Sequence, residues 1–334
     1  MPRRGSDAAS GRLRPTWPPS GASWGAAVAV EIRPRPLRIR IPATTSNLGP
    51  GFDVLGMALA LYNDIEVSVL PGKGPDQVEI AGEGADRLPR DGRNLVLRAF
   101  REALGWKFHH PLRWRMKNRI PLCRGLGSSG AARLGGALAA AALSRTGKDR
   151  WPDFVAAACR MEGHPDNVMP AFFGGLCGSY RVDRELRFFR LRRPVGLRAV
   201  VCIPELEVPT EKARRVLPKT VPLADAVRTA ARLAVLVTAF EQRRYERLAA
   251  GMDDVLHQPY RKRLIPGLYE ALSAARRAGA HGAALSGSGS AVFALSPTAA
   301  AARAGAAMAR AFARRGLRSR SLVLDFDYRG AEVR

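Results

Sequence analysis

Residues 121–130 read Pro-Leu-Cys-Arg-Gly-Leu-Gly-Ser-Ser-Gly and lie between an expected strand at 112–117 and an expected Ala-rich helix at 128–143. Closely spaced glycines let a backbone approach a ligand and point its N–H groups into the turn, and the following helix presents its positive N-terminus to an anion. The hydroxyls of Ser128 and Ser129 can contact a phosphate oxygen or Mg²⁺. This stretch therefore predicts a phosphate-binding loop.

Two other phosphate-binding motifs fit this stretch poorly. Gly125, Gly127 and Gly130 satisfy the spacing GxGxxG, and Asp149 follows 19 residues after the last of them. However, the motif lies in the middle of the chain, Pro121 interrupts a direct entry from the strand, and no series of βαβ units surrounds it. A Rossmann oxidoreductase is therefore disfavoured, and a Walker A loop would need a lysine that is absent here.

The rest of the chain mixes strands and helices, which predicts an α+β fold. Alternating apolar residues predict strands at 37–41, 65–70, 77–80, 112–117, 176–182, 186–191, 197–203, 283–285, 291–295 and 322–326. Helical patterns cover 94–104, 128–143, 151–161, 210–217, 223–240, 245–252, 266–278 and 298–315. We expect three parts: an extension at 1–36, an N-terminal domain at 37–205 and a C-terminal domain at 206–334.

Length and composition exclude several classes of protein. The chain has 334 residues, of which 46% are hydrophobic and 25% charged, as in ordinary globular proteins. Its longest apolar run, 134–143, is shorter than the ~18 residues that a membrane span needs. The four cysteines form no CxxC pair, which argues against a structural zinc site and fits a reducing compartment. Residues 1–36 lack apolar periodicity, so we expect a disordered extension or an upstream start codon.

The net charge of +25 is unusual and comes mostly from arginine. A basic surface attracts phosphate backbones, so a nucleic-acid-binding protein is one alternative. The arginines are scattered over the whole chain, and no known nucleic-acid-binding motif accompanies them. We therefore expect solvated charges, no nucleic-acid partner and no membrane partner, with a preference for small anionic ligands.

Two further glycine-rich segments lie before and after the phosphate-binding loop at 121–130 in the sequence. Residues 42–53, Pro-Ala-Thr-Thr-Ser-Asn-Leu-Gly-Pro-Gly-Phe-Asp, follow the first strand and place Asn47 and Asp53 among turn residues. Residues 285–293, Leu-Ser-Gly-Ser-Gly-Ser-Ala-Val-Phe, form a tight turn between two expected strands. Taken singly, each is typical of a turn or hairpin.

Together, these three segments resemble the ordered motifs of the GHMP small-molecule kinases. Residues 162–167 (Glu-Gly-His-Pro-Asp-Asn), 210–218 and 257–261 (His-Gln-Pro-Tyr-Arg) further resemble motifs of the homoserine kinase branch of that family. The resemblance runs in order from Leu37 to Phe326. The chain departs from the family pattern at Gly130, where alanine is usual, and at Ser290, where proline is common.

The resemblance implies a fold and a reaction. The GHMP kinase two-domain fold has an N-terminal domain like ribosomal protein S5 domain 2 and a ferredoxin-like C-terminal domain, with the active site between them. The implied reaction transfers a phosphoryl group from ATP to L-homoserine in threonine biosynthesis. It also implies a cytoplasmic enzyme that forms a homodimer and needs Mg²⁺. A GHMP kinase acting on mevalonate or shikimate remains an alternative.

The same resemblance implies roles for individual residues. Ser129 and Glu162 are the expected Mg²⁺ ligands, with Ser128 as the alternative serine. The expected ATP-binding residues are Pro121, Leu122, Arg124, Gly125, Leu126, Gly127, Ser128, Ser129 and Gly130. The expected substrate-binding residues are Asn47 and Asp53 together with Arg214 and Arg261, the two arginines that match the family's carboxylate clamp. The expected catalytic residues are His164, Asn167 and Thr210. Asn167 stands where several other GHMP kinases have an aspartate base, so the acceptor of the hydroxyl proton stays open.

Overall fold

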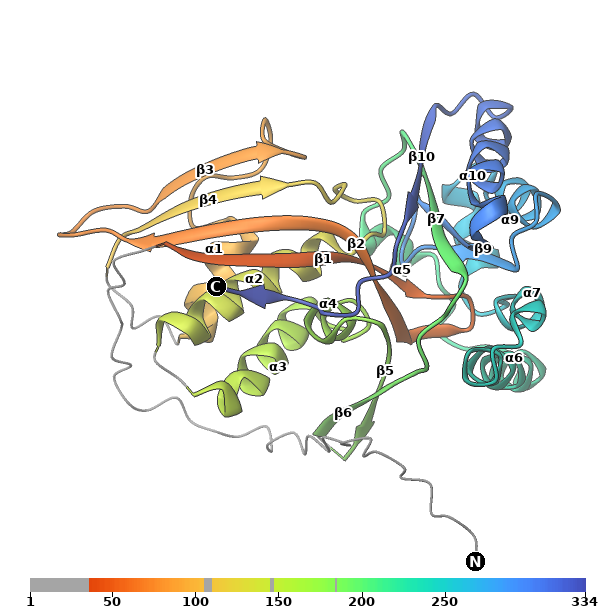
Figure 1. The fold of residues 1–334 in the computed structure, drawn as a ribbon, viewed down its shortest axis with the longest axis horizontal. Helices are drawn as coiled ribbons and strands as arrows, with labels where there is room; N and C mark the ends of the chain where they lie inside the picture. The colour runs from red at the N-terminus through yellow and green to blue at the C-terminus, as the bar shows by residue number, and fades with distance from the viewer. Residues whose placement is uncertain (1–35, 105–109, 145–146, 184) are drawn as a thin grey trace, which may run out of the picture.

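The structure is a computed structural model that describes residues 36–104, 110–144, 147–183 and 185–334. The expected extension at 1–36 lies outside the described residues except for Pro36. The described chain forms two β-sheets, each with helices packed against it (Figure 1).

The larger sheet has seven strands in the order β11-β1-β2-β4-β3, with β5 and β6 attached through β2. Its strands are β1 (Leu37–Asn47), β2 (Gly51–Val69), β3 (Gln77–Gly82), β4 (Leu112–Asn118), β5 (Leu176–Val182), β6 (Glu185–Arg190) and β11 (Glu332–Val333). Helices α1 (Leu95–Ala103), α2 (Ser128–Leu143), α3 (Trp151–Glu162) and α4 (Val168–Phe173) lie on one side of it, and a 3₁₀ turn, Lys148–Arg150, precedes α3 (Figure 1).

Small residues explain how α2 packs so closely in this layer. A Cβ at Gly136 would lie 2.1 Å from the backbone carbonyl oxygen of Val96 in α1, so only glycine permits this approach. On the same helix, Gly135 lies against the side chains of Ile41 and Ile65 from the sheet. The Ala-rich composition of α2 therefore brings its backbone close both to α1 and to the sheet.

Strands β1 and β2 are longer than the sequence patterns predict. Their expected ranges were 37–41 and 65–70, and the segment 42–53 was expected to be a turn; instead, only residues 48–50 separate the two strands. The alternation stops at Pro42 because every residue from Ile41 to Asn47 is buried, and a strand buried on both faces has no two-residue periodicity. The segment 42–53 thus lies mostly in the ends of β1 and β2 that meet at residues 48–50.

The smaller sheet has four antiparallel strands in the order β10-β7-β9-β8. They are β7 (Leu197–Pro204), β8 (Gly282–Leu285), β9 (Val292–Pro297) and β10 (Ser319–Leu324), and helices α9 (Leu268–Arg277) and α10 (Thr298–Ala313) pack on them. This order places the fourth strand first, then the first, third and second, which is the ferredoxin-like arrangement. The expected C-terminal fold is confirmed.

Four helices connect β7 to α9. They are α5 (Thr210–Arg215), α6 (Leu223–Glu241), α7 (Leu248–Gly251) and α8 (Gln258–Arg261), with 3₁₀ turns at Tyr245–Arg247 and Lys262–Leu264. No helix in the described part of the chain is long and apolar enough to cross a membrane. Because β7 precedes residue 206 yet joins the smaller sheet, and β11 returns to the larger one, the division at 205/206 stays a prediction.

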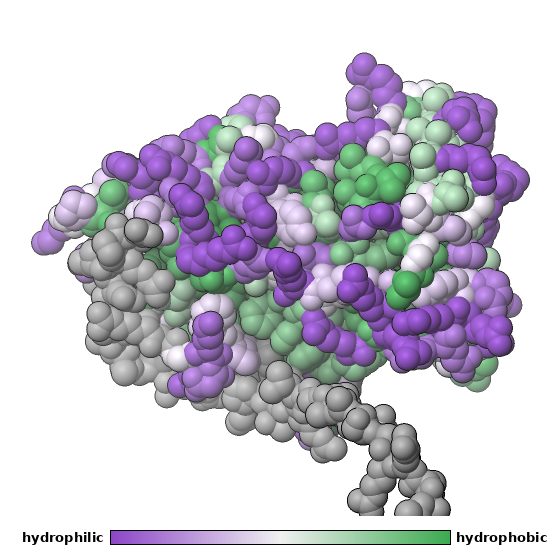
Figure 2. All heavy atoms as spheres, in the orientation of Figure 1, coloured by the Kyte–Doolittle hydropathy of each residue, from purple (hydrophilic) through white to green (hydrophobic). Residues whose placement is uncertain are grey.

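Many arginines lie on the surface beside carboxylates. On the outer face of the larger sheet, Arg38 pairs with Glu66 and Arg40 with Asp64 across β1 and β2. Figure 2 shows hydrophilic side chains over much of the visible described surface. Single exposed pairs contribute little to stability, so these charges mainly keep the face solvated.

Candidate active site

The phosphate-binding loop needs glycine at two positions. Gly125 and Gly127 both have φ of 72°, in the left-handed region that disfavours other residues. A Cβ on Gly125 would lie 2.0 Å from the Ser286 carbonyl oxygen, and one on Gly127 would lie 2.0 Å from Oγ1 of Thr44. Gly127 is also the N-cap of α2, a helix of 16 residues. The loop therefore presents a helix N-terminus whose N-cap residue carries no side chain.

Hydrogen bonds join the three glycine-rich segments. The backbone N–H of Thr44 donates to the Leu126 carbonyl at 3.1 Å, which ties β1 to the loop. From the turn between β8 and β9, the Ser286 hydroxyl donates to the Gly125 carbonyl at 2.7 Å, and the N–H of Gly287 donates to the Ser46 carbonyl at 3.1 Å. Segments from both sheets thus build one site.

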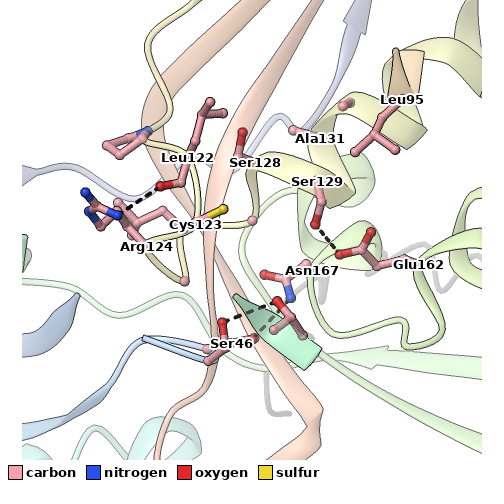
Figure 3. Close-up of a pocket in the computed structure, with 18 of the residues that line it drawn as sticks. Ser46, Leu95, Leu122, Cys123, Arg124, Ser128, Ser129, Ala131, Glu162 and Asn167 are labelled. Carbon is pink, nitrogen blue, oxygen red and sulfur yellow. Dashed lines mark hydrogen bonds between the residues drawn. The ribbon is translucent and has the colours of Figure 1, made fainter. Parts of the chain in front are cut away.

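A cavity of about 340 Å³ lies where these segments meet, and Figure 3 shows part of its lining. The expected site residues that line it are Asn47, Asp53, Pro121, Leu122, Arg124, Gly125, Leu126, Gly127, Ser128, Ser129, Glu162, His164, Asn167, Thr210, Arg214 and Arg261. Gly130 does not line the cavity. It lies in α2, where an added Cβ would lie 3.2 Å from the Cβ of Asn167.

Asn167 lines the cavity and is held by hydrogen bonds on both sides of its amide. Its Nδ2 donates to Oγ of Ser46 at 3.3 Å (Figure 3). The same nitrogen donates to Oδ1 of Asp166 at 3.2 Å, and Oδ1 of Asn167 accepts from the Thr44 hydroxyl at 2.8 Å. Only 7% of the residue is exposed. The side chain is therefore fixed in orientation before any ligand binds.

His164 and Asp166 form a hydrogen-bonded pair beside Asn167. Nδ1 of His164 meets Oδ1 of Asp166, whose side chain is almost fully buried. Burial opposes the charged form of the imidazole, but the hydrogen bond to Asp166 and the charge of that carboxylate outweigh burial and raise the pKa of His164. Carboxylate oxygens of Asp53 and Asp166 and a ring nitrogen of His164 all lie within 4.8 Å of one another.

Ser129 and Glu162 meet at the N-terminus of α2. The Ser129 hydroxyl donates to Oε1 of Glu162 at 2.6 Å (Figure 3). Arg133 forms an ion pair with the other carboxylate oxygen. Both residues offer hard oxygen donors next to the phosphate-binding loop, and Mg²⁺ prefers one or two such ligands plus waters and phosphate oxygens. The pair fits a magnesium ion that is shared with a bound nucleotide.

Asp53 and Arg214 form an ion pair in the lining of the cavity. Nη1 and Nη2 of Arg214 donate to the two carboxylate oxygens of Asp53 at 3.0 and 2.8 Å. The hydrogen bond to Asp53 is the main reason that the pKa of Arg214 is raised. Asn47 fixes the neighbouring backbone, because its Oδ1 accepts from the Asp53 N–H and its Nδ2 donates to the Gly287 carbonyl, both at 3.1 Å.

Arg261 is a buried cation that has no acidic partner among the residues that the structure describes. Only 2% of the residue is exposed, and its hydrogen bonds go to the carbonyls of Ala213 and Gly287 and to the ring of His257. No carboxylate among the described residues forms an ion pair with it. Burial, followed by the nearby charge of Arg214, lowers the pKa of Arg261 to about 10. A buried guanidinium that lacks a carboxylate partner favours an anionic ligand in the cavity.

Thr210 lies at the rim of the cavity, at the start of α5. Its Oγ1 is 3.4 Å from Oγ of Ser288, in the turn between β8 and β9. The two hydroxyls therefore stand together at the edge of the site, on segments that are far apart in the sequence.

Sequence reasoning missed several residues of the site. Three of them, Thr44, Ser46 and Asp166, lie inside motifs quoted above, so their positions in the sequence indicated the site. The sequence could not show which way their side chains point. Arg133 carries no such signal. A further part of the wall is formed by the start of α1 and the segment before it, namely Leu88, Pro89, Arg93, Asn94, Leu95 and Val96. The helical pattern at 94–104 predicted this helix but not its place at the site.

Comparisons with known proteins agree with this architecture. Residues 94–175 match the GHMP kinases N terminal domain, and residues 236–314 match the family described as GHMP kinases C terminal. Homoserine kinase from Carboxydothermus hydrogenoformans is 44% identical over 82% of this chain and 87% of its own length. Homoserine kinase from Moorella thermoacetica is 43% identical, over 84% and 94% of the two chains.

Solved structures give the same result. The crystal structure of homoserine kinase from Cytophaga hutchinsonii superposes with a TM-score of 0.80 at 29% identity and covers 91% of this chain and 99% of its own. L. major mevalonate kinase, solved with R-mevalonate, has a TM-score of 0.64 at 16% identity over 84% and 94% of the chains, a likeness of fold alone. Fold and site together define a kinase of the GHMP class. Within that class, the chain belongs to the homoserine kinase family.

Proposed function

We propose that the chain transfers the γ-phosphoryl group of ATP to the side-chain hydroxyl of L-homoserine, yielding ADP and O-phospho-L-homoserine. The observation that carries this proposal is the buried guanidinium of Arg261, which lines the cavity and has no acidic partner among the described residues. An amino-acid acceptor supplies the missing carboxylate. A guanidinium suits this role because its planar donors match the two oxygens of a carboxylate.

ATP binds at the loop between β4 and α2. The backbone N–H groups of Gly125–Ser129 and the N-terminus of α2 hold its phosphates, and Pro121, Leu122 and Arg124 line the same wall. Ser129 and Glu162 hold Mg²⁺. When bound, that ion neutralises phosphate charge and helps to orient the transferred group.

The acceptor binds between the loop and the smaller sheet. Arg261 and Arg214 bind its carboxylate, and Asp53 binds its ammonium group. In the structure Asp53 and Arg214 satisfy each other. A zwitterion can replace that pairing with one ammonium–carboxylate and one guanidinium–carboxylate contact, so neither charge loses its partner.

Asn167, His164 and Thr210 surround the reacting hydroxyl. Phosphoryl transfer depends on positioning and charge stabilisation more than on covalent chemistry by the protein. Both ends of the Asn167 amide are already held, so this residue serves to orient, and an amide cannot take the hydroxyl proton. We infer that the proton passes to the transferred phosphoryl group.

Three wider features belong to the same proposal. The reaction takes place in the cytoplasm as a step toward threonine, the enzyme acts as a homodimer, and residues 37–205 and 206–334 form its two domains. Gel filtration with light scattering tests the dimer directly, because a monomeric mass at micromolar concentration would refute it.

The product identifies the reaction. Purified protein incubated with ATP, Mg²⁺ and L-homoserine should give ADP and a phosphomonoester in the ³¹P NMR spectrum, stable to hydroxylamine. A hydroxylamine-sensitive acyl phosphate would show that the carboxylate is phosphorylated instead. Release of inorganic phosphate alone would show an ATPase. Either of these results would overturn the proposal.

A further inference from the structure

His257 is fully buried next to Arg261 and is absent from the roles assigned above. It is the N-cap of α8, and its exposed fraction is 0%. Its Nε2 lies 2.9 Å from the Gly49 carbonyl oxygen, and its Nδ1 lies 3.2 Å from Nη1 of Arg261. The imidazole therefore links the turn between β1 and β2 to the buried guanidinium.

The two contacts fix which nitrogen carries the proton. A carbonyl oxygen only accepts hydrogen bonds, so Nε2 must donate to Gly49. An arginine only donates, so Nδ1 must accept from Arg261. These requirements are met together only by the neutral ring with its proton on Nε2. Burial lowers the pKa of His257 to about 4, despite the nearby carboxylate of Asp254, which agrees with a neutral ring.

The remaining contacts of Arg261 leave one nitrogen for a ligand. Nε donates to the Ala213 carbonyl at 3.3 Å, and Nη1 donates to the Gly287 carbonyl at 2.9 Å as well as to His257. Both Nη1 protons are then used. Among the described residues, Nη2 has no hydrogen-bond acceptor, although the side chain lines the cavity.

Phe52 supports both side chains from one face. Its ring stacks on the imidazole of His257 at 5.2 Å with an interplanar angle of 29°. The same ring lies 5.2 Å from the guanidinium carbon of Arg261, within the range of a cation–π contact. Rotation of the His257 ring away from Arg261 would therefore break the stacking as well as two hydrogen bonds.

We propose that His257 is a positioning residue for acceptor recognition: its Nδ1 holds Nη1 of Arg261 so that Nη2 stays available to the carboxylate of the acceptor. This inference rests on the proposed function, because it takes the acceptor to be an amino acid bound through Arg261. His257 itself touches neither ATP nor the reacting hydroxyl. Its effect is therefore expected on acceptor affinity and not on nucleotide affinity.

Two substitutions separate the two hydrogen bonds of the ring. His257→Gln keeps a donor near the position of Nε2 and removes the acceptor for Arg261, whereas His257→Asn keeps an acceptor near the position of Nδ1. We expect His257→Gln to raise the KM for homoserine roughly 10- to 100-fold, the effect of one hydrogen bond to a charged group. The KM for ATP should stay unchanged, and His257→Asn should retain most of the acceptor affinity. His281→Gln, a histidine outside the cavity, is the matched control.

A second measurement does not depend on how much of each variant folds. Homoserinol has a hydroxymethyl group in place of the carboxylate, so the ratio of kcat/KM for homoserine over homoserinol cancels the active fraction. The ratio should fall in His257→Gln, and in the double variant with Arg261→Ala it should fall no further than in Arg261→Ala alone.

Different outcomes refute different claims. A wild-type enzyme that turns over ATP without phosphorylating homoserine would refute the proposed function. A wild-type enzyme active on homoserine, with an unchanged ratio in His257→Gln, would overturn the positioning role alone. Equal increases in the KM for ATP and for homoserine would also overturn it, since that pattern indicates a general structural defect.

Discussion

Asp53 and Arg214 are joined by two hydrogen bonds of 3.0 and 2.8 Å, although 161 positions separate them in the sequence. Asp53 lies in β2 of the larger sheet, and Arg214 lies in α5, which follows the first strand of the smaller sheet. The contact therefore joins the larger sheet to a helix that follows the first strand of the smaller sheet, within the lining of the cavity. Arg261, which also lines the cavity, is buried without an acidic partner in the described chain. Asp53, Arg214 and Arg261 together therefore carry two positive charges and one negative charge.

Removal of the Arg261 guanidinium should weaken acceptor use strongly. Removal of one partner from a desolvated charge pair costs about 2–5 kcal/mol of binding free energy. Arg261→Ala should therefore lower kcat/KM for homoserine roughly 30- to 4,000-fold. Part of the loss should appear in kcat, because remote binding energy also orients the hydroxyl. Arg261→Lys should restore only part of it, since an ammonium lacks the planar pair of donors. Steady-state kinetics with each substrate varied measures both effects.

The exposed Arg247 provides the control for this substitution. Arg247→Ala should behave like the wild type. If Arg261→Ala raises the KM for ATP as much as the KM for homoserine, then Arg261 serves the nucleotide or the fold, and the carboxylate assignment is wrong.

Glu162 should be needed for metal-dependent turnover. Glu162→Gln keeps the shape of the side chain and removes the charge that neutralises Mg²⁺, so kcat should fall roughly 10²-fold or more. The Mg²⁺ concentration that gives half-maximal activity should rise. The exposed Glu246 gives a matched control as Glu246→Gln. Wild-type kinetics in Glu162→Gln would show that this carboxylate only anchors Ser129 and Arg133.

One of the four cysteines should report nucleotide binding. Cys123 is exposed and lines the cavity beside the phosphate-binding loop, whereas Cys159, Cys177 and Cys202 are buried. Burial raises the pKa of Cys177 and of Cys202 to about 11 and also raises the pKa of Cys159, so none of these thiols reacts readily. A chromogenic disulfide reagent should label one thiol in the native protein.

Bound MgATP should slow that labelling in proportion to occupancy of the site. Cys123→Ser should abolish this labelling, which would assign the reactive thiol to Cys123. Labelling of Cys123 at the same rate with and without saturating MgATP would place the nucleotide elsewhere.

The buried ring of His257 should make stability depend on pH. The groups that face it are Asp254, Asp53, Arg261 and the Gly49 carbonyl, and its pKa falls from 6.5 to about 4 mainly through burial. Between these values the unfolded chain binds a proton that the folded chain does not, so the free energy of unfolding decreases as pH falls from about 6.5 to about 4. Below that window the contribution changes no further.

Urea unfolding of the wild type and of His257→Gln isolates this effect from the carboxylates, which titrate in both proteins. The stability difference between them should shrink, or change sign in favour of the variant, as pH is lowered through the window. A difference that stays constant from pH 7 to pH 4 would contradict a neutral buried His257.

The order of the motifs made most of the site predictable, because all the expected site residues except Gly130 line one cavity. The extents of β1 and β2 could not be predicted, since a strand with both faces buried shows no alternation. The six-residue helix α4 is too short to show helical periodicity. Directions of side chains were also inaccessible: Asp166 lies in a quoted motif, but only the fold shows that it holds His164 and Asn167.

The most direct test of the account is a coupled ADP-release assay over L-homoserine, L-threonine, L-serine, mevalonate and shikimate, each with ATP and Mg²⁺. The account predicts that kcat/KM is highest for L-homoserine and that ADP release above background needs the acceptor. It also predicts that mevalonate and shikimate, which lack an ammonium group for Asp53, are poor substrates. Faster turnover with mevalonate or shikimate, or none with L-homoserine, would contradict it.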